Sequence, residues 1–233
     1  MVRFDDQYHE TAVLRDGARV TLRVVRPDDK ALLRRGFERL SPASRYRRFL
    51  ATKSYLSDAE LAYLTEVDGH DHFAMGAVVE DAQGAEEGVA IGRFIRSNTD
   101  PGVAEVAVAV VDDWQGKGLG TLLLLRLVAA ARERGIERFA GQVLASNDAI
   151  RAVLAQLQSV RTLEEGNELA VQVDLPEVPF DQAPKPEDRE TPLRRLWRLV
   201  TRDLVRVQNI MQRLTGTAAD DESKRREASR TGV

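Results

Sequence analysis

A cluster of glycines stands between an apolar segment and a helix-like segment, in the stretch VVDDWQGKGLG at residues 110–120. A Walker A loop requires G-x-x-x-x-G-K-[ST], but here Lys117 is followed by Gly118 and no glycine stands at the required earlier position. A dinucleotide fingerprint requires G-x-G-x-x-G, and after Gly116 and Gly118 the required third glycine is replaced by Thr121. The spacing therefore excludes both of these phosphate-binding loops.

The remaining pattern, QGKGLG at 115–120, still favours an anion ligand. Glycine lets the backbone come close to a ligand because no β-carbon intervenes. The first N–H groups of a helix have no intrahelical partner, and the helix dipole is positive at that end. Several N–H groups can therefore converge on a pyrophosphate, with Lys117 adding charge at the rim. A glycine-rich turn that binds no ligand is the alternative.

Three other groups of residues have types that could do chemistry. Glu105 is the one carboxylate in the alternating apolar strand VAEVAVAVV (103–111), where a charge is costly unless it is paired or functional. An ion pair with an arginine such as Arg93, or exposure to solvent, is the alternative. His70 and His72 lack an evident third metal ligand, so we predict no metal site. The basic SRYRRF segment (44–49) is interpreted as a solvated helix face, and steering of an acidic substrate or a phosphate is the alternative.

The elements that must position these residues follow from periodicity and capping signals. Alternating or β-branched runs predict strands at 18–27, 72–80, 88–97, 103–111, 137–145 and 168–175. Periodic segments with start signals predict helices at 27–40, 41–50, 57–67, 117–134 and 146–158. Ser57 and Glu60 form a predicted capping box. Hairpins followed by strand–helix units indicate an α/β fold with a mixed central sheet and helices on both faces.

Composition bounds the class of protein. The chain has 233 residues, a net charge of -3 and no cysteine. These values exclude disulfides, cysteine-based zinc sites and a catalytic thiol, and they argue against nucleic-acid binding by the whole surface. The N-terminus lacks the apolar core of a signal peptide, and no window reaches the roughly 18 to 20 apolar residues of a membrane span. We therefore expect a cytoplasmic protein.

The composition changes near residue 177. We predict a folded domain at 1–177, a Pro-rich linker at 178–192, a basic amphipathic helix at 193–214 and a disordered tail at 215–233. The helix at 193–214 could dock on the domain or on a second subunit as a homodimer contact. It could instead bind a partner protein, or lie on an anionic membrane surface, which is the least favoured of the three.

The stretch VAVAVVDDWQGKGLGTLLLLRLVAAARERGI resembles the acetyl-CoA-binding motif of the GCN5-related N-acetyltransferase (GNAT) family, whose turn reads [QR]-x-x-G-x-[GA]. Gln115, Gly118 and Gly120 occupy the three defining positions, and VLASNDAIRAVLAQLQSV resembles the second motif of the family. The resemblance covers roughly residues 18–175. The cofactor-binding residues that it implies are Val108, Ala109, Val110, Gln115, Gly116, Lys117, Gly118, Leu119, Gly120, Thr121 and Asn147.

The family resemblance also implies a mechanism, in which an amine attacks the thioester of acetyl-CoA directly. A glutamate on the strand before the turn is the general base in related protein acetyltransferases, and Glu105 is the matching residue. One backbone N–H of Val108, Ala109 or Val110 would stabilise the oxyanion. The family's tyrosine, which protonates the departing thiolate, is replaced by Leu154. Because that tyrosine is absent, the general acid is unassigned. The family's Gly-Phe pair is also replaced, by Gln158 and Ser159.

The stretches VTLRVVRPDDKALLRRGFERLSPASRYRRF and LTEVDGHDHFAMGAVVE resemble more closely the acetyltransferase domain of bacterial protein-lysine acetyltransferases that act on acyl-CoA synthetases. That domain is often fused to a synthetase-like or nucleotide-binding module, which we do not find in these 233 residues. We expect an acetyl-CoA-dependent N-acyltransferase with a protein-lysine acceptor and no metal. Acetylation of a small amine, or an acyl-CoA-binding sensor without catalysis, are the alternatives.

Overall fold

The computed structural model describes residues 3–49, 53–81, 83–144, 160–165 and 168–175. Its strands are β1 (His9–Val13), β2 (Arg19–Val24), β3 (His72–Glu80), β4 (Glu86–Arg96), β5 (Val103–Val110), β6 (Arg138–Leu144), β7 (Val160–Glu165) and β8 (Glu168–Asp174). Its helices are α1 (Lys30–Glu38), α2 (Pro42–Phe49), α3 (Asp58–Thr65) and α4 (Leu119–Glu133), with 3-10 turns at Pro27–Asp29 and Asp112–Trp114. None of the described helices is long and apolar enough to cross a membrane.

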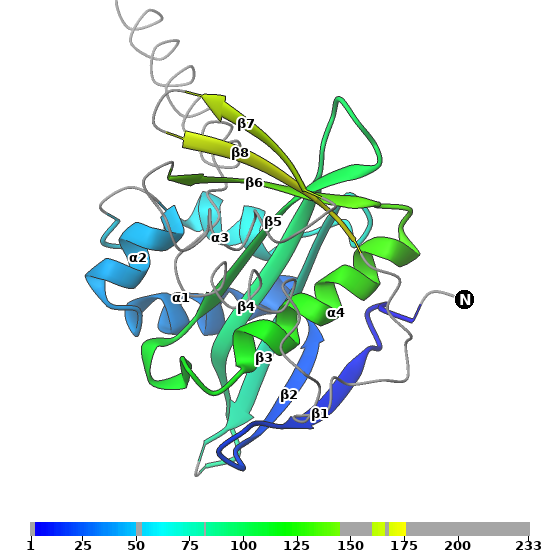
Figure 1. The fold of residues 1–233 in the computed structure, drawn as a ribbon. Helices are drawn as coiled ribbons and strands as arrows, with labels where there is room; N and C mark the ends of the chain where they lie inside the picture. The colour runs from blue at the N-terminus through cyan, green and yellow to red at the C-terminus, as the bar shows by residue number, and fades with distance from the viewer. Residues whose placement is uncertain (1–2, 50–52, 82, 145–159, 166–167, 176–233) are drawn as a thin grey trace, which may run out of the picture.

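The strands form one mixed sheet in the order β1-β2-β3-β4-β5-β6-β8-β7. Neighbouring strands pair antiparallel from β1 to β5 and again from β6 to β7, whereas β5 and β6 pair parallel. Figure 1 shows α4 on one face of this sheet and α1, α2 and α3 on the other. The expected mixed sheet with helices on both faces is confirmed.

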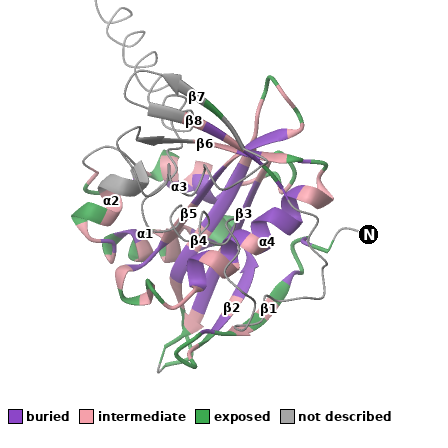
Figure 2. Cartoon of the chain, in the orientation of Figure 1, coloured by how far each residue is buried: buried purple, intermediate pink, exposed green. Residues whose placement is uncertain are grey.

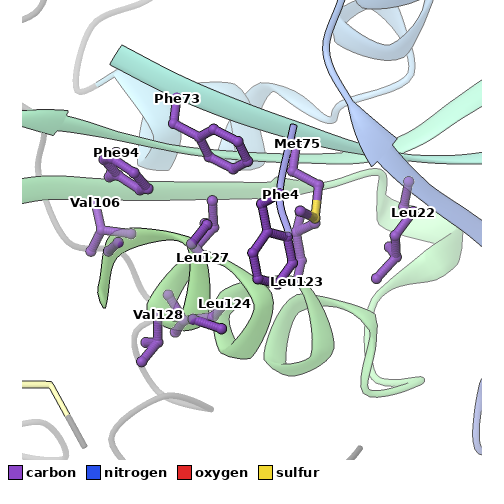
Figure 3. Packing of buried hydrophobic residues seen from close by; sticks show 14 of the residues in the cluster. Phe4, Leu22, Phe73, Met75, Phe94, Val106, Leu123, Leu124, Leu127 and Val128 are labelled. Atoms are coloured by element: carbon purple, nitrogen blue, oxygen red, sulfur yellow. The ribbon is translucent and has the colours of Figure 1, made fainter. Parts of the chain in front are cut away.

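Helix α4 and the sheet enclose the main apolar core. Leu123, Leu124, Leu127 and Val128 of α4 are fully buried. They pack against a set of side chains from β2 to β5, among them Phe73 and Phe94, whose ring centroids lie 5.3 Å apart. Figure 3 shows these leucines beneath the sheet, and Figure 2 shows that the central strands and the inner side of α4 are buried. This packing fixes where α4 begins relative to the end of β5.

Helices α1 and α3 cover the opposite face. The backbones of α1 and β4 approach closely, since a β-carbon added at Gly36 would lie 3.5 Å from the carbonyl oxygen of Gly88. Helix α3 begins at the predicted capping box: the Ser57 hydroxyl accepts from the backbone N–H of Glu60, and the Glu60 carboxylate accepts from the N–H of Ser57 at 2.9 Å. This box is confirmed. It fixes the start of the helix that lies over the middle of β4 and β5.

The structure confirms most of the predicted elements and adds two. The predicted strands and the helices at 27–40, 41–50, 57–67 and 117–134 are present, with ends shifted by a few residues. Strands β1 and β7 were not predicted. The helix expected at 146–158 and the three segments expected at 178–192, 193–214 and 215–233 lie outside the described residues. Those four expectations, and the domain boundary near 177, stay predictions.

Candidate functional site

Strands β5 and β6 are paired over only part of their lengths and then separate. Their parallel pairing joins Val103, Ala104 and Glu105 to residues 138–140 and then stops, although β5 runs on to Val110 and β6 to Leu144. Figure 1 shows the two strands diverging from this point. The edge of β5 that faces β6 is therefore left without a strand partner over residues 106–110, among the strands that the structure describes. Such an edge offers backbone N–H and C=O groups to an extended ligand.

The register of β4 on β5 decides which backbone groups face this opening. Val111 N–H donates to the Val89 carbonyl, and Ser97 N–H donates to the Val103 carbonyl. In an antiparallel pair the backbone groups of alternate residues point to the same neighbour. Odd-numbered residues of β5, including Ala109, therefore bond to β4, while Val108 and Val110 face β6. Of the three backbone positions that the family resemblance implied, these two point into the opening.

The predicted glycine turn follows β5 and leads into α4. Gly116 and Gly118 have φ values of 77° and 90°, a region that suits glycine. Gly118 is the N-cap of α4 and makes no side-chain cap, so the N–H groups of Leu119, Gly120 and Thr121 have no intrahelical acceptor. The first helical bond runs from Leu122 N–H to the Gly118 carbonyl. The start of α4 thus presents free donors and the positive end of a fifteen-residue helix.

Gln115 connects the turn to the strand that precedes it. Its Nε2 donates to the Val110 carbonyl at 3.0 Å, and lies 3.3 Å from Oδ1 of Asp112 and 3.4 Å from Oγ of Ser44 on α2. The side chain therefore holds the end of β5, the 3-10 turn and the start of α2 together. Gln115, the first residue of the glycine motif, therefore stabilises the conformation of the turn.

Lys117 is held by the turn between β1 and β2, which sequence analysis did not single out. Its Nζ lies 2.9 Å from Oδ2 of Asp16 and 4.7 Å from the centroid of the Trp114 ring. The hydrogen bond from Lys117 lowers the pKa of Asp16 below its ordinary value. In addition, Arg15 N–H donates to the Lys117 carbonyl at 3.4 Å. The β1–β2 turn, residues 14–18, is thereby docked on the glycine turn.

Glu105 lies on the face of the sheet that α3 covers. Ala104 and Val106 belong to the core under α4, whereas Ala107 packs with Tyr63 of α3 and with Ile95. Side chains alternate along a strand, so Glu105 shares the face of Ala107. It is partly buried, and its Oε2 is withdrawn from solvent. Its position is the last one at which β5 and β6 remain paired, so it stands where the opening begins.

Arg93 is the most deeply buried charged side chain among the described residues, with 2% of its surface exposed. It is opposite Ala107 in the register, which places it diagonal to Glu105. Its Nη1 lies 3.1 Å from Nε2 of His72, and its Nη2 donates to the Leu64 carbonyl at 3.2 Å. The contact with Arg93 gives His72, at the start of β3, a hydrogen-bond partner. In the sequence analysis, an ion pair with Arg93 is the alternative role of Glu105. The strand register also places these two residues near each other.

His72 is held neutral by its surroundings. Burial, reinforced by the charge of Arg93, lowers the pKa of His72 to about 4. An imidazole without its second proton can accept the hydrogen bond of Arg93 at Nε2. His70, in contrast, is exposed and bonds to Asp71 at 2.7 Å. Within the described residues, no three His, Asp or Glu side chains gather as metal ligands would.

A cavity of about 80 Å³ lies between α1 and the sheet, on the same face as Glu105. Small residues line much of it, including Gly36, Gly88, Ala90 and Ala109, and Arg93 lies at its wall. A buried ion pair closes another part: Arg23 donates to both oxygens of Asp29 at 2.8 Å. This face therefore combines apolar walls with buried charge.

The family model for the GNAT acetyltransferase family matches residues 32–157, which include β5, the glycine turn and α4. This match covers more than half of the chain. The chain belongs to the GNAT acetyltransferase family. A structure of the GNAT domain of S. lividans PAT agrees: it is 30% identical and covers 74% of this chain and 99% of its own, with a TM-score of 0.63.

Two curated GNAT relatives are acetyltransferases by name. "Acetyltransferase Pat" of Mycolicibacterium smegmatis is 35% identical over 178 residues, which are 73% of this chain and 50% of the relative. "Acetyltransferase PA5475" of Pseudomonas aeruginosa is 34% identical over 149 residues, which are 64% of this chain and 79% of the relative. The chain thus matches about half of the length of the first relative.

Two features of the GNAT motifs fall outside the described residues. Asn147, expected to bind the cofactor from the second motif, is one of them. Leu154, which replaces the family's tyrosine, is the other. The described part of the site therefore consists of the β5 edge, the glycine turn, and the side chains around Glu105.

Proposed function

We propose that this GNAT protein binds acetyl-CoA along the open edge of β5 and transfers the acetyl group to an amine, with a protein lysine as acceptor. The observation that carries the proposal is the continuity of two binding surfaces. The opening between β5 and β6 begins at Glu105, and the same strand leads directly into a glycine turn whose helix N–H groups are free. An extended chain that ends in a diphosphate has the shape and chemistry to follow both.

Backbone groups would hold the cofactor in this arrangement. Val108 N–H and C=O face the opening and suit the amide groups of the pantetheine arm. The N–H groups of residues 119–121 suit the diphosphate. The glycine turn fits close approach of a phosphate, because Gly116 and Gly118 have no β-carbon and their positive φ values suit glycine. Asn147 stays a predicted further contact.

The chain's own groups then account for acyl transfer. Acetyl-CoA supplies an acyl group activated as a thioester. A lysine amine is protonated at pH 7, since its reference pKa is about 10.4, so a base must accept a proton. Glu105 accepts that proton, directly or through a water, as the amine nitrogen bonds to the acyl carbon. A backbone N–H of β5 donates to the carbonyl oxygen, and the carbon–sulfur bond breaks to release the CoA thiolate.

The acceptor is the finer part of the proposal. The family resemblance favours a protein lysine, and the Glu105 face lies beside α3 and the cavity, where an aliphatic lysine stem finds apolar walls. A small amine is the alternative enzyme substrate. A sensor that binds acyl-CoA without transfer is the alternative that the Leu154 position supports.

A labelling experiment tests the proposal. The full chain is incubated with a bacterial lysate and radiolabelled acetyl-CoA, and proteins are separated and analysed for acetyl-lysine by mass spectrometry. We expect label on protein lysines that is absent without the chain. Label on polyamines or aminoglycosides alone would favour the small-amine alternative. Tight acetyl-CoA binding without transfer to any amine would favour the sensor.

A further inference from the structure

We propose that Arg15, on the turn between β1 and β2, is a further ligand of the coenzyme's diphosphate beside the start of α4. The inference rests on the proposed function, because it requires coenzyme A to lie in the glycine turn. It assigns a binding role to a residue about one hundred positions before the motif.

The position of Arg15 is fixed by the fold. A β-carbon built on Gly118 would lie 3.4 Å from Nε of Arg15 and 3.8 Å from its Cγ and Cδ. The guanidinium stem therefore passes directly beside the N-cap of α4. The backbone bond from Arg15 N–H to the Lys117 carbonyl holds the two turns together. The side chain is exposed, so it can reach a ligand in the turn.

The charge balance at the turn distinguishes Arg15 from Lys117. The ammonium of Lys117 is 2.9 Å from the carboxylate of Asp16, so the two charges largely offset each other. Among the described residues no carboxylate pairs with Arg15. The cation that remains available to an anion at this helix start is thus Arg15. Lys117, which sequence analysis placed at the rim, contributes its charge mainly to Asp16.

Two further carboxylates stand near the turn. Asp112 and Asp113 stand in the 3-10 turn before Gln115. Asp112 Oδ1 lies 3.3 Å from Nε2 of Gln115, while Asp113 lies 3.8 Å from Nη2 of Arg39. These two carboxylates bring negative charge close to a site proposed for an anion, although that of Asp113 is partly offset by Arg39. Helix N–H groups and the guanidinium of Arg15 oppose that charge.

Arginine suits this role chemically. Its planar guanidinium presents several N–H donors in a fixed fork and can bind two phosphate oxygens together. A diphosphate at the N-terminus of α4 would offer such oxygens, and Arg15 lies beside Gly118, the N-cap of that helix. We therefore assign Arg15 to the diphosphate and not to the 3′-phosphate of the adenosine, which lies further along the coenzyme.

Calorimetric titration of the full chain with coenzyme A tests the assignment. We expect Arg15→Gln to weaken binding about tenfold, as loss of a charge-assisted contact to phosphate would, and to reduce the salt dependence of the dissociation constant. Arg34→Gln is the matched control: it removes one positive charge from α1, where Arg34 bonds to Asp58 at 2.8 Å, and should change binding less than twofold. Equal binding by the native chain and Arg15→Gln would overturn the inference.

Coenzyme fragments identify the phosphate group. The tenfold loss should persist with 3′-dephospho-CoA, which retains the diphosphate, and should vanish with pantetheine, which has no phosphate. If the loss vanishes with 3′-dephospho-CoA, or persists with pantetheine, the assignment to the diphosphate is wrong. If the native chain does not bind coenzyme A, the proposed function itself fails, and this outcome is distinct from the others.

A second pair of variants tests the charge argument without changing Arg15. Asp16→Asn removes the partner of Lys117 and a negative charge near the anion, so we expect coenzyme A to bind a few-fold more tightly. Lys117→Gln should weaken binding less than Arg15→Gln does. The inference is contradicted if Lys117→Gln has the larger effect. Thermal unfolding of each variant, monitored by circular dichroism, verifies that the fold is retained.

Discussion

The two faces of the sheet have different contents. Under α4, leucine, valine and phenylalanine side chains fill the space, and Leu123, Leu124 and Leu127 expose none of their surface. Under α1 and α3, the wall contains small residues, a cavity of about 80 Å³ and the buried side chains of Arg23, Asp29 and Arg93. The first face is filled mainly by apolar side chains, with Arg126 of α4 paired to Glu10 of β1, whereas the second contains a cavity and three buried charged side chains.

This difference indicates that the α4 face mainly stabilises the fold, whereas the α1 and α3 face carries the proposed reaction centre. Close packing under α4 holds the start of that helix, with its free N–H groups, against the end of β5. Burying arginines costs free energy, which their bonds to Asp29 and Glu86, and to His72, offset. Variants on the two faces should therefore fail in different ways: loss of stability on the α4 face, and loss of activity or a changed pH dependence on the other.

The largest effect is expected from Glu105→Gln. If Glu105 is the base, acetyl transfer should fall by about 10²- to 10⁴-fold while the melting temperature changes little. Transfer can be followed through the CoA thiol, because the chain has no cysteine that would add background. Turnover of a confirmed acceptor that equals the native rate at every pH would show that the base assignment is wrong.

Leu127→Ala probes the packed face. Leu127 is fully buried, and its Cδ1 lies where a β-carbon on Gly92 would be only 2.7 Å away. Removing it leaves a cavity that cannot readily close, so we expect a loss of about 3 kcal/mol in the free energy of unfolding. Urea titration measures this loss, with Val13→Ala on the exposed edge strand as control. Coenzyme A binding by the folded variant should be nearly unchanged; a large loss of affinity at full folding would contradict the division between the faces.

His72→Gln tests the buried charge of the other face through pH. The folded-state pKa of His72 is about 4, below the ordinary 6.5, so only the unfolded chain binds its proton between these values. Stability should therefore rise with pH across this window by about 2 to 3 kcal/mol and level off above it. Gln offers Arg93 an acceptor but does not titrate, so the variant should lose this part of the slope. His70→Gln, exposed two residues earlier, should retain it, and an identical slope in native and His72→Gln protein would argue against a buried neutral imidazole.

Periodicity predicted the central strands and α4 because their apolar residues recur along several turns or alternations. Strand β1, HETAV, was missed because it is short, half polar and at an edge, where pairing with β2 and the bond from Arg126 of α4 to Glu10 hold it. Strand β7, VRTLEE, contains three charged residues and was missed for the same kind of reason. Both strands depend on pairing with a neighbouring strand, and the local sequence pattern of each does not predict that pairing.

The candidate site was predictable where it depends on local sequence. The glycine turn, the helix that follows it and the face of Glu105 follow from spacing and alternation. The pairing of Lys117 with Asp16, and the position of Arg15 beside Gly118, depend on a hairpin turn that contacts the motif across the fold. A sequence read segment by segment treats Lys117 as a free cation. In the fold, that positive charge forms an ion pair with Asp16.

The short parallel pairing of β5 with β6 has a consequence for cooperativity. Three residue pairs join a five-stranded antiparallel meander, β1 to β5, to the group formed by β6, β8 and β7. Backbone hydrogen bonds are thus dense within each group and sparse between them. The sheet is continuous in space but divides along this seam into two units that can open locally with different free energies. The paired part of the seam ends at Glu105, so the proposed reaction centre lies at the boundary with the fewest residue pairs among the described strands.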